Sequence, residues 1–300
     1  GGEQNVIVGA YAGDAQTVGD YNVLMGYNAG TTINATDANG SVGIGHSALG
    51  AVTSGEGNTA IGYQTLLVED DGDYNTAVGF QALKAQTGVS GEVGNTAVGW
   101  KAMITTNTGK YNTAVGRGTL GDSTTHSGSV ALGYNAGGTI TTGNMNIGIG
   151  YDAMNGAATT GDNNIAIGAS AGDAITSGKE NILMGLNAGG AMTTNTLNTV
   201  IGHGAFAAAD AGEDANVIIG HGAGDAINDG GSDANVIIGF DAGIGGAAAM
   251  LSCVVIGRDA MRATAGNAQT GTVAIGKDSL SALTTGAGNV AVGFAAGALL

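Results

Sequence analysis

Aromatic and basic side chains recur at nearly regular intervals along this chain, each directly after a glycine that ends a short apolar run. The aromatic members of this column are Tyr27, Tyr63, Phe80, Trp100, Tyr134, Tyr151, Phe240 and Phe294. In other repeats the same position holds His46, His203, His221, Arg117, Arg258 and Lys277. Because aromatic faces stack on ligands, the column predicts a half-exposed ridge that binds a glycan or a protein of a host. The simpler interpretation is that these side chains cover a turn and stack on one another.

Acidic residues in two loops offer the oxygen ligands that calcium prefers. The two groups are Glu69, Asp70, Asp71 and Asp73, and Asp225, Asp229 and Asp233. Neither has the spacing of a nine-residue calcium roll or of an EF-hand loop, so we expect solvated loop faces and no cofactor. The histidines fall in different repeats, and only His203 and His221 occupy neighbouring repeats of one column. No metal site is predicted.

Catalytic arrangements are not recognisable in the sequence. It contains no nucleophile elbow, no phosphate-binding loop and no paired carboxylates at catalytic spacing. Val78–Leu83 reads Val-Gly-Phe-Gln-Ala-Leu, which matches one hexapeptide of the left-handed β-helix acyltransferases. Those enzymes need the hexapeptide three times per coil, and here it occurs once. We therefore expect no enzymatic activity.

Charge and composition exclude several classes of protein. The chain has 24 acidic and 8 basic residues and a formal net charge of −16, which argues against nucleic acid or anionic lipid as a partner. Its 59 glycines lack the three-residue period and the proline of collagen. Apolar runs are short and interrupted by glycine, so no segment is expected to insert into a membrane. The single cysteine, Cys253, rules out an intrachain disulfide and is expected to be a small core residue.

A pentapeptide, Asn-Thr-Ala-Val-Gly at Asn75–Gly79, recurs in variant form seventeen times. Nine of the sixteen intervals between its glycines are 17 residues, and the others are 18 to 20. Because so short a period leaves no room for an ordinary globular core, each repeat must be one turn of a stacked array. The sequence therefore predicts an all-β fold, a parallel β-solenoid of about 17 residues per coil. We expect residues 1–300 to form one continuous solenoid that is a segment of a longer fibre.

The residues before the repeat glycine predict a short strand that is apolar on both faces. Val, Ile or Thr stands three residues before the glycine in every repeat, and Val, Ile, Leu or Met stands one residue before it. The residue between them, such as Leu24 or Ala77, projects from the opposite face and is also apolar or small. One face can fill the interior of the coil. The other face needs a second surface, most simply another copy of the chain, so a homo-oligomer is expected.

Polar and small residues mark the two ends of this strand. Asparagine stands four residues before the glycine in thirteen repeats, among them Asn58, Asn75, Asn95, Asn112 and Asn146. Stacked above one another, these amides predict a hydrogen-bonded ladder along the solenoid axis. The residue four after the glycine and the residue two before it differ in size in a reciprocal way. Gly13 is small where Ile7 is large, and Leu83 is large where Ala77 is small. This reciprocity, which holds in most repeats, predicts that two columns fill one space.

Two stretches carry a resemblance to a known family: Asn58–Leu66, which reads Asn-Thr-Ala-Ile-Gly-Tyr-Gln-Thr-Leu, and Ser129–Gly137, which reads Ser-Val-Ala-Leu-Gly-Tyr-Asn-Ala-Gly. They resemble the head repeats of YadA-like trimeric autotransporter adhesins and the related repeats of bacteriophage tail-fibre proteins, and the resemblance extends over the whole chain. It implies a left-handed parallel β-roll that assembles as a trimer. The repeat here is longer, with extra Thr and Gly in the outer loop. The coiled-coil stalk and membrane anchor of the adhesins are not among these residues, so attachment to an outer membrane is not carried over.

These observations favour a structural fibre or adhesin shaft, extracellular on a bacterial cell surface or on a virion, that presents many binding surfaces to a host glycan or protein. One alternative is a secreted fibril that assembles end to end. Another is an ice- or mineral-binding solenoid, because Thr59, Thr76, Thr96 and Thr113 stack in four consecutive repeats. Against that alternative, Val or Ile replaces Thr in twelve repeats and no paired Thr-x-Thr array is present.

Overall fold

A computed structural model describes residues 2–35, 38–87, 90–245, 249–263, 268–283 and 286–298. Within these ranges it consists of short strands, turns and bends without any helix, so the all-β prediction is confirmed. No described segment is therefore a helix that could cross a membrane. The coils fall into two compact units, residues 1–145 and 146–300, and each unit is a parallel β-solenoid.

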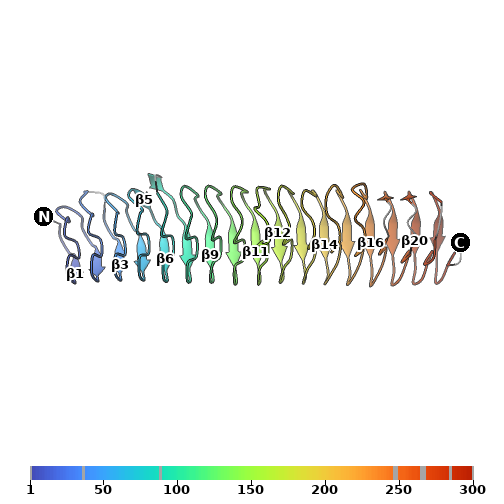
Figure 1. The fold of residues 1–300 in the computed structure, drawn as a ribbon, viewed down its shortest axis with the longest axis horizontal. Helices are drawn as coiled ribbons and strands as arrows, with labels where there is room; N and C mark the ends of the chain where they lie inside the picture. Colours follow the sequence, from blue (N-terminus) through green and yellow to red (C-terminus); the bar gives the residue numbers. More distant parts are fainter. Residues whose placement is uncertain are drawn as a thin grey trace. The chain divides into compact units, whose positions relative to one another are not determined.

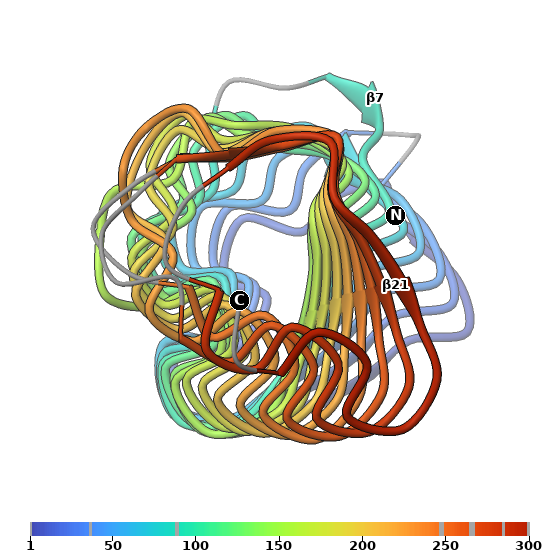
Figure 2. The same cartoon turned by 90° about the vertical axis from the view of Figure 1, so that its right-hand side faces the viewer.

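Unit 1 contains eight three-residue strands in its described part, and each pairs in parallel with the next one along the chain (Figure 1). These strands are β1 (Val6–Val8), β2 (Val23–Met25), β3 (Val42–Ile44), β4 (Thr59–Ile61), β6 (Thr76–Val78), β8 (Thr96–Val98), β9 (Thr113–Val115) and β10 (Val130–Leu132). Two further strands, β5 (Gly72–Asp73) and β7 (Gly91–Glu92), pair with each other in the outer loops, and Figure 2 shows β7 projecting beyond the outline of the coils.

Unit 2 repeats this arrangement with nine three-residue strands in its described part. They are β11 (Ile147–Ile149), β12 (Ile165–Ile167), β13 (Ile182–Met184), β14 (Thr199–Ile201), β15 (Val217–Ile219), β16 (Val236–Ile238), β18 (Val254–Ile256), β20 (Val273–Ile275) and β21 (Val290–Val292). An outer-loop pair, β17 (Met250–Leu251) and β19 (Gln269–Thr270), accompanies them. In both units the register joins equivalent positions of successive repeats, so each sequence column becomes a row of side chains along the axis.

The interior of each unit is filled by the middle residue of each strand and the residue four after the repeat glycine. Leu24 and Leu83 are both fully buried. A Cβ placed on Gly30 would lie 2.7 Å from Leu24 Cδ2, and one placed on Gly43 would lie 3.0 Å from Leu49 Cδ1. Each small residue therefore makes room for a large one from the other column, and the two columns fill one space as expected.

The repeat glycine allows neighbouring coils to approach closely. Gly79 has a φ of 132°, which side-chain-bearing residues rarely adopt. A Cβ at this position would lie 2.4 Å from the carbonyl oxygen of Gly99 in the next coil. No residue other than glycine fits this corner without moving the backbone.

The outward face of the strands remains at the surface of the single chain. In β4, the inward Ala60 is fully buried, whereas Ile61 is 37% exposed. In β9, Ala114 is likewise buried and Val115 is 39% exposed. The outward face carries uncharged side chains, which are Val, Ile, Leu, Met or Thr, and only the inward face is covered by the chain itself.

Candidate functional site

Within each unit, the residues directly after the repeat glycine stand in a row at the corner where each strand ends, and we call this row the exit ridge of that unit. Its members in unit 1 are Ala10, Tyr27, His46, Tyr63, Phe80, Trp100, Arg117 and Tyr134. Its members in unit 2 are Tyr151, Ala169, Leu186, His203, His221, Phe240, Arg258, Lys277 and Phe294. All eight aromatic residues predicted to form a ligand ridge lie in it, and each of them is exposed.

In the first half of unit 1 the rings of the exit ridge stack face to face. The centroids of Tyr27 and His46 are 5.1 Å apart, and those of Tyr63 and Phe80 are 5.2 Å apart with an interplanar angle of 8°. His46 bridges the two pairs, with its ring centroid 5.1 Å from that of Tyr63. Stacking turns the ring faces towards one another, so these residues present mainly ring edges to solvent. This geometry supports the simpler interpretation for the stretch from Tyr27 to Phe80.

In the second half of unit 1 cations take the place of rings in the stack. The guanidinium carbon of Arg117 lies 4.5 Å from the ring centroid of Trp100 and 4.9 Å from that of Tyr134. The Arg117 Nη1 donates a 2.6 Å hydrogen bond to Tyr134 Oη, and Lys101 Nζ lies 4.4 Å from the Trp100 centroid. Two positive charges therefore gather around one indole ring.

The exit ridge of unit 2 is less continuous, because Ala169 and Leu186 occupy two of its positions. His221 stacks on Phe240 at 5.0 Å, whereas His203 meets His221 edge-on at 4.9 Å. Arg258 lies 5.9 Å from the ring of Phe240. Lys277 is similarly placed at 5.1 Å from the ring of Phe294. Tyr151 is 59% exposed.

The asparagine column lies inside the units and joins successive coils. Asn58 donates from Nδ2 to the carbonyl oxygen of Gly72 at 2.8 Å, and its Oδ1 accepts from the backbone N–H of Asn75 at 2.9 Å. Equivalent bonds to the next coil involve Asn75, Asn95, Asn112 and Asn146. Most of these bonds run from side chain to backbone. The asparagine side chains therefore hydrogen-bond backbone groups of the turn that enters each strand, which is a structural role.

The acidic loops differ from the sequence expectation at one residue. Glu69 is fully buried, and its Oε1 accepts from the backbone N–H of Gly72 at 2.8 Å. The predicted solvated loop is therefore wrong for Glu69, whose pKa is raised because burial strips water from the carboxylate. Across the described ranges no three His, Cys, Asp or Glu side chains gather closely enough to hold a metal ion.

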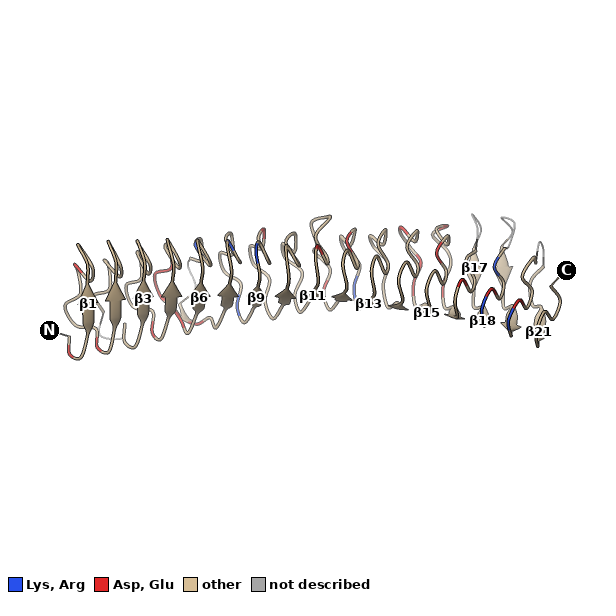
Figure 3. Cartoon of the chain, turned by 90° about the horizontal axis from the view of Figure 1, so that it is seen from below, with Lys and Arg blue, Asp and Glu red and all other residues tan. Residues whose placement is uncertain are grey.

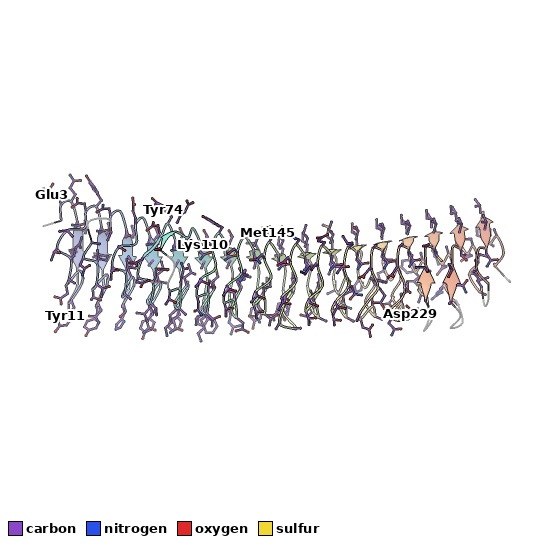
Figure 4. All side chains as sticks on the ribbon, turned by 90° about the horizontal axis from the view of Figure 1, so that it is seen from above. Glu3, Tyr11, Tyr74, Lys110, Met145 and Asp229 are labelled. Carbon is purple, nitrogen blue, oxygen red and sulfur yellow. The ribbon has the colours of Figure 1, made fainter. Side chains whose placement is uncertain are left out.

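A second row of exposed apolar side chains was not singled out from the sequence. It stands five residues before the repeat glycine and contains Tyr21, Tyr74, Tyr111 and Met145 in unit 1, and Leu197 has the equivalent position in unit 2. Figure 4 places Tyr74 and Met145 on one edge of unit 1 and Tyr11 on the other. Tyr74 packs over Gly57, and the nearby charge of Glu56, then partial burial and the charge of Asp73, raise the pKa of its phenol. The sequence did carry one sign that this column is unusual. Glycine is frequent in it, because the backbone at this position has a positive φ.

The chemistry available on the exit ridge is noncovalent recognition by ring edges, guanidinium and ammonium groups. Among the described histidines of the exit ridge, only His46 contacts a nucleophilic side chain. Its Nδ1 lies 2.9 Å from Ser47 Oγ. Comparisons with protein families, with curated proteins and with solved structures find no match to this chain.

Proposed function

We propose that this chain is a structural shaft that associates with copies of itself through the outward face of its strands and displays the exit ridge outside that contact. The observation that carries the proposal is the composition of the outward face. Both of its columns are Val, Ile, Thr, Leu or Met in all seventeen repeats, without a single charged residue. In a chain with a net charge of −16, this face is an uncharged and mostly apolar stripe within each unit.

Physical chemistry favours covering this stripe. Burying apolar surface is favourable by about 25 cal/mol per Å². The outward Ile and Val side chains repeat in every coil, so a partner with the same period would bury them all along the contact. A second copy has that period, whereas an unrelated globular partner does not.

The family resemblance supplies the finer features of the proposal. The head repeats of YadA-like adhesins and their relatives in tail fibres are left-handed rolls, assembled in threes on a cell surface or a virion. A trimeric, left-handed, extracellular shaft is consistent with the apolar outward face and with the acidic exterior. On such a shaft the exit ridge would be present in three copies, which favours multivalent attachment to a host surface.

Sedimentation velocity on the whole chain tests this proposal. We expect a particle of three times the 28.8 kDa chain mass. The double variant I61K and V115K places two charges on the outward face and should sediment as a monomer with unchanged far-ultraviolet circular dichroism. V68K is the matched control, because Val68 is 41% exposed in an outer loop rather than on the outward face. A monomeric wild-type chain, or a V68K variant that dissociates as readily, would contradict the proposal.

A further inference from the structure

The basic residues of the two units differ in how they are neutralised. In unit 2 all four pair with carboxylates, as Lys179 does with Asp162 at 3.7 Å and Arg258 with Asp259 at 3.0 Å. The other two pairings are Arg262 with Asp241 and Asp259, and Lys277 with Asp278. Figure 3 shows blue and red segments side by side at β18. In the described part of unit 1, by contrast, no carboxylate forms an ion pair with Lys84, Lys101, Lys110 or Arg117.

Arg117 is both held in place and exposed at the surface. Its guanidinium lies between the rings of Trp100 and Tyr134, at 4.5 and 4.9 Å, and the bond from Nη1 to Tyr134 Oη fixes its rotation. The side chain is nevertheless exposed, so a ligand in solvent can reach the guanidinium. Fixing a flexible arginine before a ligand arrives reduces the entropy lost on binding.

We propose that Trp100, Lys101, Arg117 and Tyr134 form a binding site for a glycan that carries an isolated carboxylate. The planar fork of a guanidinium matches a carboxylate with two parallel hydrogen bonds. Lys101 adds a second positive charge beside Trp100, and Trp100 and Tyr134 are 42% and 39% exposed, so both rings leave apolar surface beside the cations for contact with a sugar. The inference deepens the display part of the proposed function and rests on it for its biological meaning.

The surrounding charge selects among anionic ligands. Carboxylates outnumber basic residues 24 to 8 over the chain, so a densely charged polymer would meet repulsion wherever it extended beyond the site. Screening in physiological salt confines charge effects to about 8 Å. A single acidic sugar among neutral ones meets the two cations of the site without bringing further charges near the rest of the surface.

Unit 2 provides a matched control within the same chain. Arg258 lies 5.9 Å from the Phe240 ring, at the same column position as Arg117. Its Nε already donates to Asp259 Oδ2 at 3.0 Å. Arg258 is therefore a cation of the same type, at the same repeat position and beside a ring, that is already neutralised, and it should not bind an external carboxylate.

Binding of the whole chain to surfaces coated with defined saccharides tests the site. The probes are a lactose-based trisaccharide with a carboxylate on its terminal sugar, lactose as the neutral probe, and a heparin fragment as the densely charged probe. We expect preference for the carboxylated trisaccharide. R117Q should weaken this binding about tenfold or more, as expected for losing hydrogen bonds to a charged group. R117K should fall between wild type and R117Q, and R258Q should bind as wild type does.

Three results would overturn the site: equal binding to the carboxylated and neutral probes, equal losses in R117Q and R258Q, or strongest binding to heparin. Circular dichroism and sedimentation of each variant establish that the fold and the assembly are unchanged. Failure of the site is distinguishable from failure of the shaft. A self-associating chain without carboxylate preference refutes only the site, whereas a monomer that binds the carboxylated probe refutes only the shaft.

Discussion

His126 is a large titratable residue inside unit 1, and its surroundings disfavour the charged form of its ring. Its ring is fully buried, and neither ring nitrogen has a hydrogen-bond partner. Burial lowers its pKa from 6.5 to about 4, because the charged imidazole would lose its hydration. The equivalent position of a repeat in unit 2 holds Gln269, which is also fully buried. A large uncharged side chain is therefore acceptable at this column position.

The H126Q variant should remove one component of acid sensitivity. The unfolded chain binds a proton on His126 near pH 6.5, whereas the folded chain does so only near pH 4. Stability that is fully present above pH 6.5 is therefore lost as the pH falls towards 4, by roughly 3 kcal/mol. Urea-unfolding free energies of wild type and H126Q, measured at pH 7 and at pH 4.5, should differ in their pH dependence by an amount of this order.

Glu69 shows why the comparison with H126Q is needed. Its pKa is raised by burial, so the folded chain holds a proton on Glu69 more tightly than the unfolded chain does. The cost of burying this carboxylate applies above its folded pKa and is relieved as the pH falls through that value. The two groups oppose each other in a wild-type pH profile, and H126Q leaves the effect of Glu69 in place. Parallel profiles for the two proteins would refute the role assigned to His126.

At the scale of the coil, asparagine side chains connect one turn to the next. Asn58 serves both a carbonyl and an N–H of the following coil, and both groups are buried. Ser41, one coil earlier in the same column, retains part of this role, because its Oγ accepts from the backbone N–H of Asn58 at 3.2 Å. The column therefore tolerates a shorter acceptor.

Substitutions at Asn58 should destabilise in a graded way. N58A leaves the buried Gly72 carbonyl and Asn75 N–H without their partner, at a cost of about 1–3 kcal/mol for each group left unpaired. N58S keeps an acceptor for the Asn75 N–H and should lose about half as much. Hydrogen exchange should accelerate at the Asn75 amide more in N58A than in N58S. Equal exchange rates in the two variants would show that the side-chain acceptor does not protect this amide.

The strands were predictable because every coil repeats the same environment. Seventeen aligned residues per position reveal whether a position is apolar, small or amide-bearing, and the structure places the columns inside or outside accordingly. The outer loops differ in length and sequence, so their positions cannot be compared across the repeats in this way. The burial of Glu69 and His126 was therefore not predictable, since each occurs in a single loop. The exit ridge was found as a column, but the rotation of its rings and the pairing of its cations depend on side-chain packing that column identity does not encode.

At the scale of the whole molecule, an apolar stripe and a strongly acidic remainder act in opposite directions on assembly. The outward face favours contact between copies, while a net charge of −16 on each copy opposes it. Binding of a carboxylate at Arg117 and Lys101 has the opposite dependence on charge, because there the ligand and the site attract. Raising the ionic strength should therefore strengthen self-association and weaken carboxylate binding.

Raising sodium chloride from about 20 mM to about 500 mM should shorten the range of charge interactions several-fold, to a few ångströms. Self-association should strengthen over this series, because repulsion between acidic copies is screened while burial of the outward face is not. Binding of the carboxylated trisaccharide should weaken over the same series, and it should weaken more steeply in wild type than in R117Q, which keeps only the charge of Lys101. Sedimentation equilibrium and saccharide-surface binding on one preparation measure both trends. If association instead weakened with salt, charge pairing rather than the apolar outward face would hold the copies together.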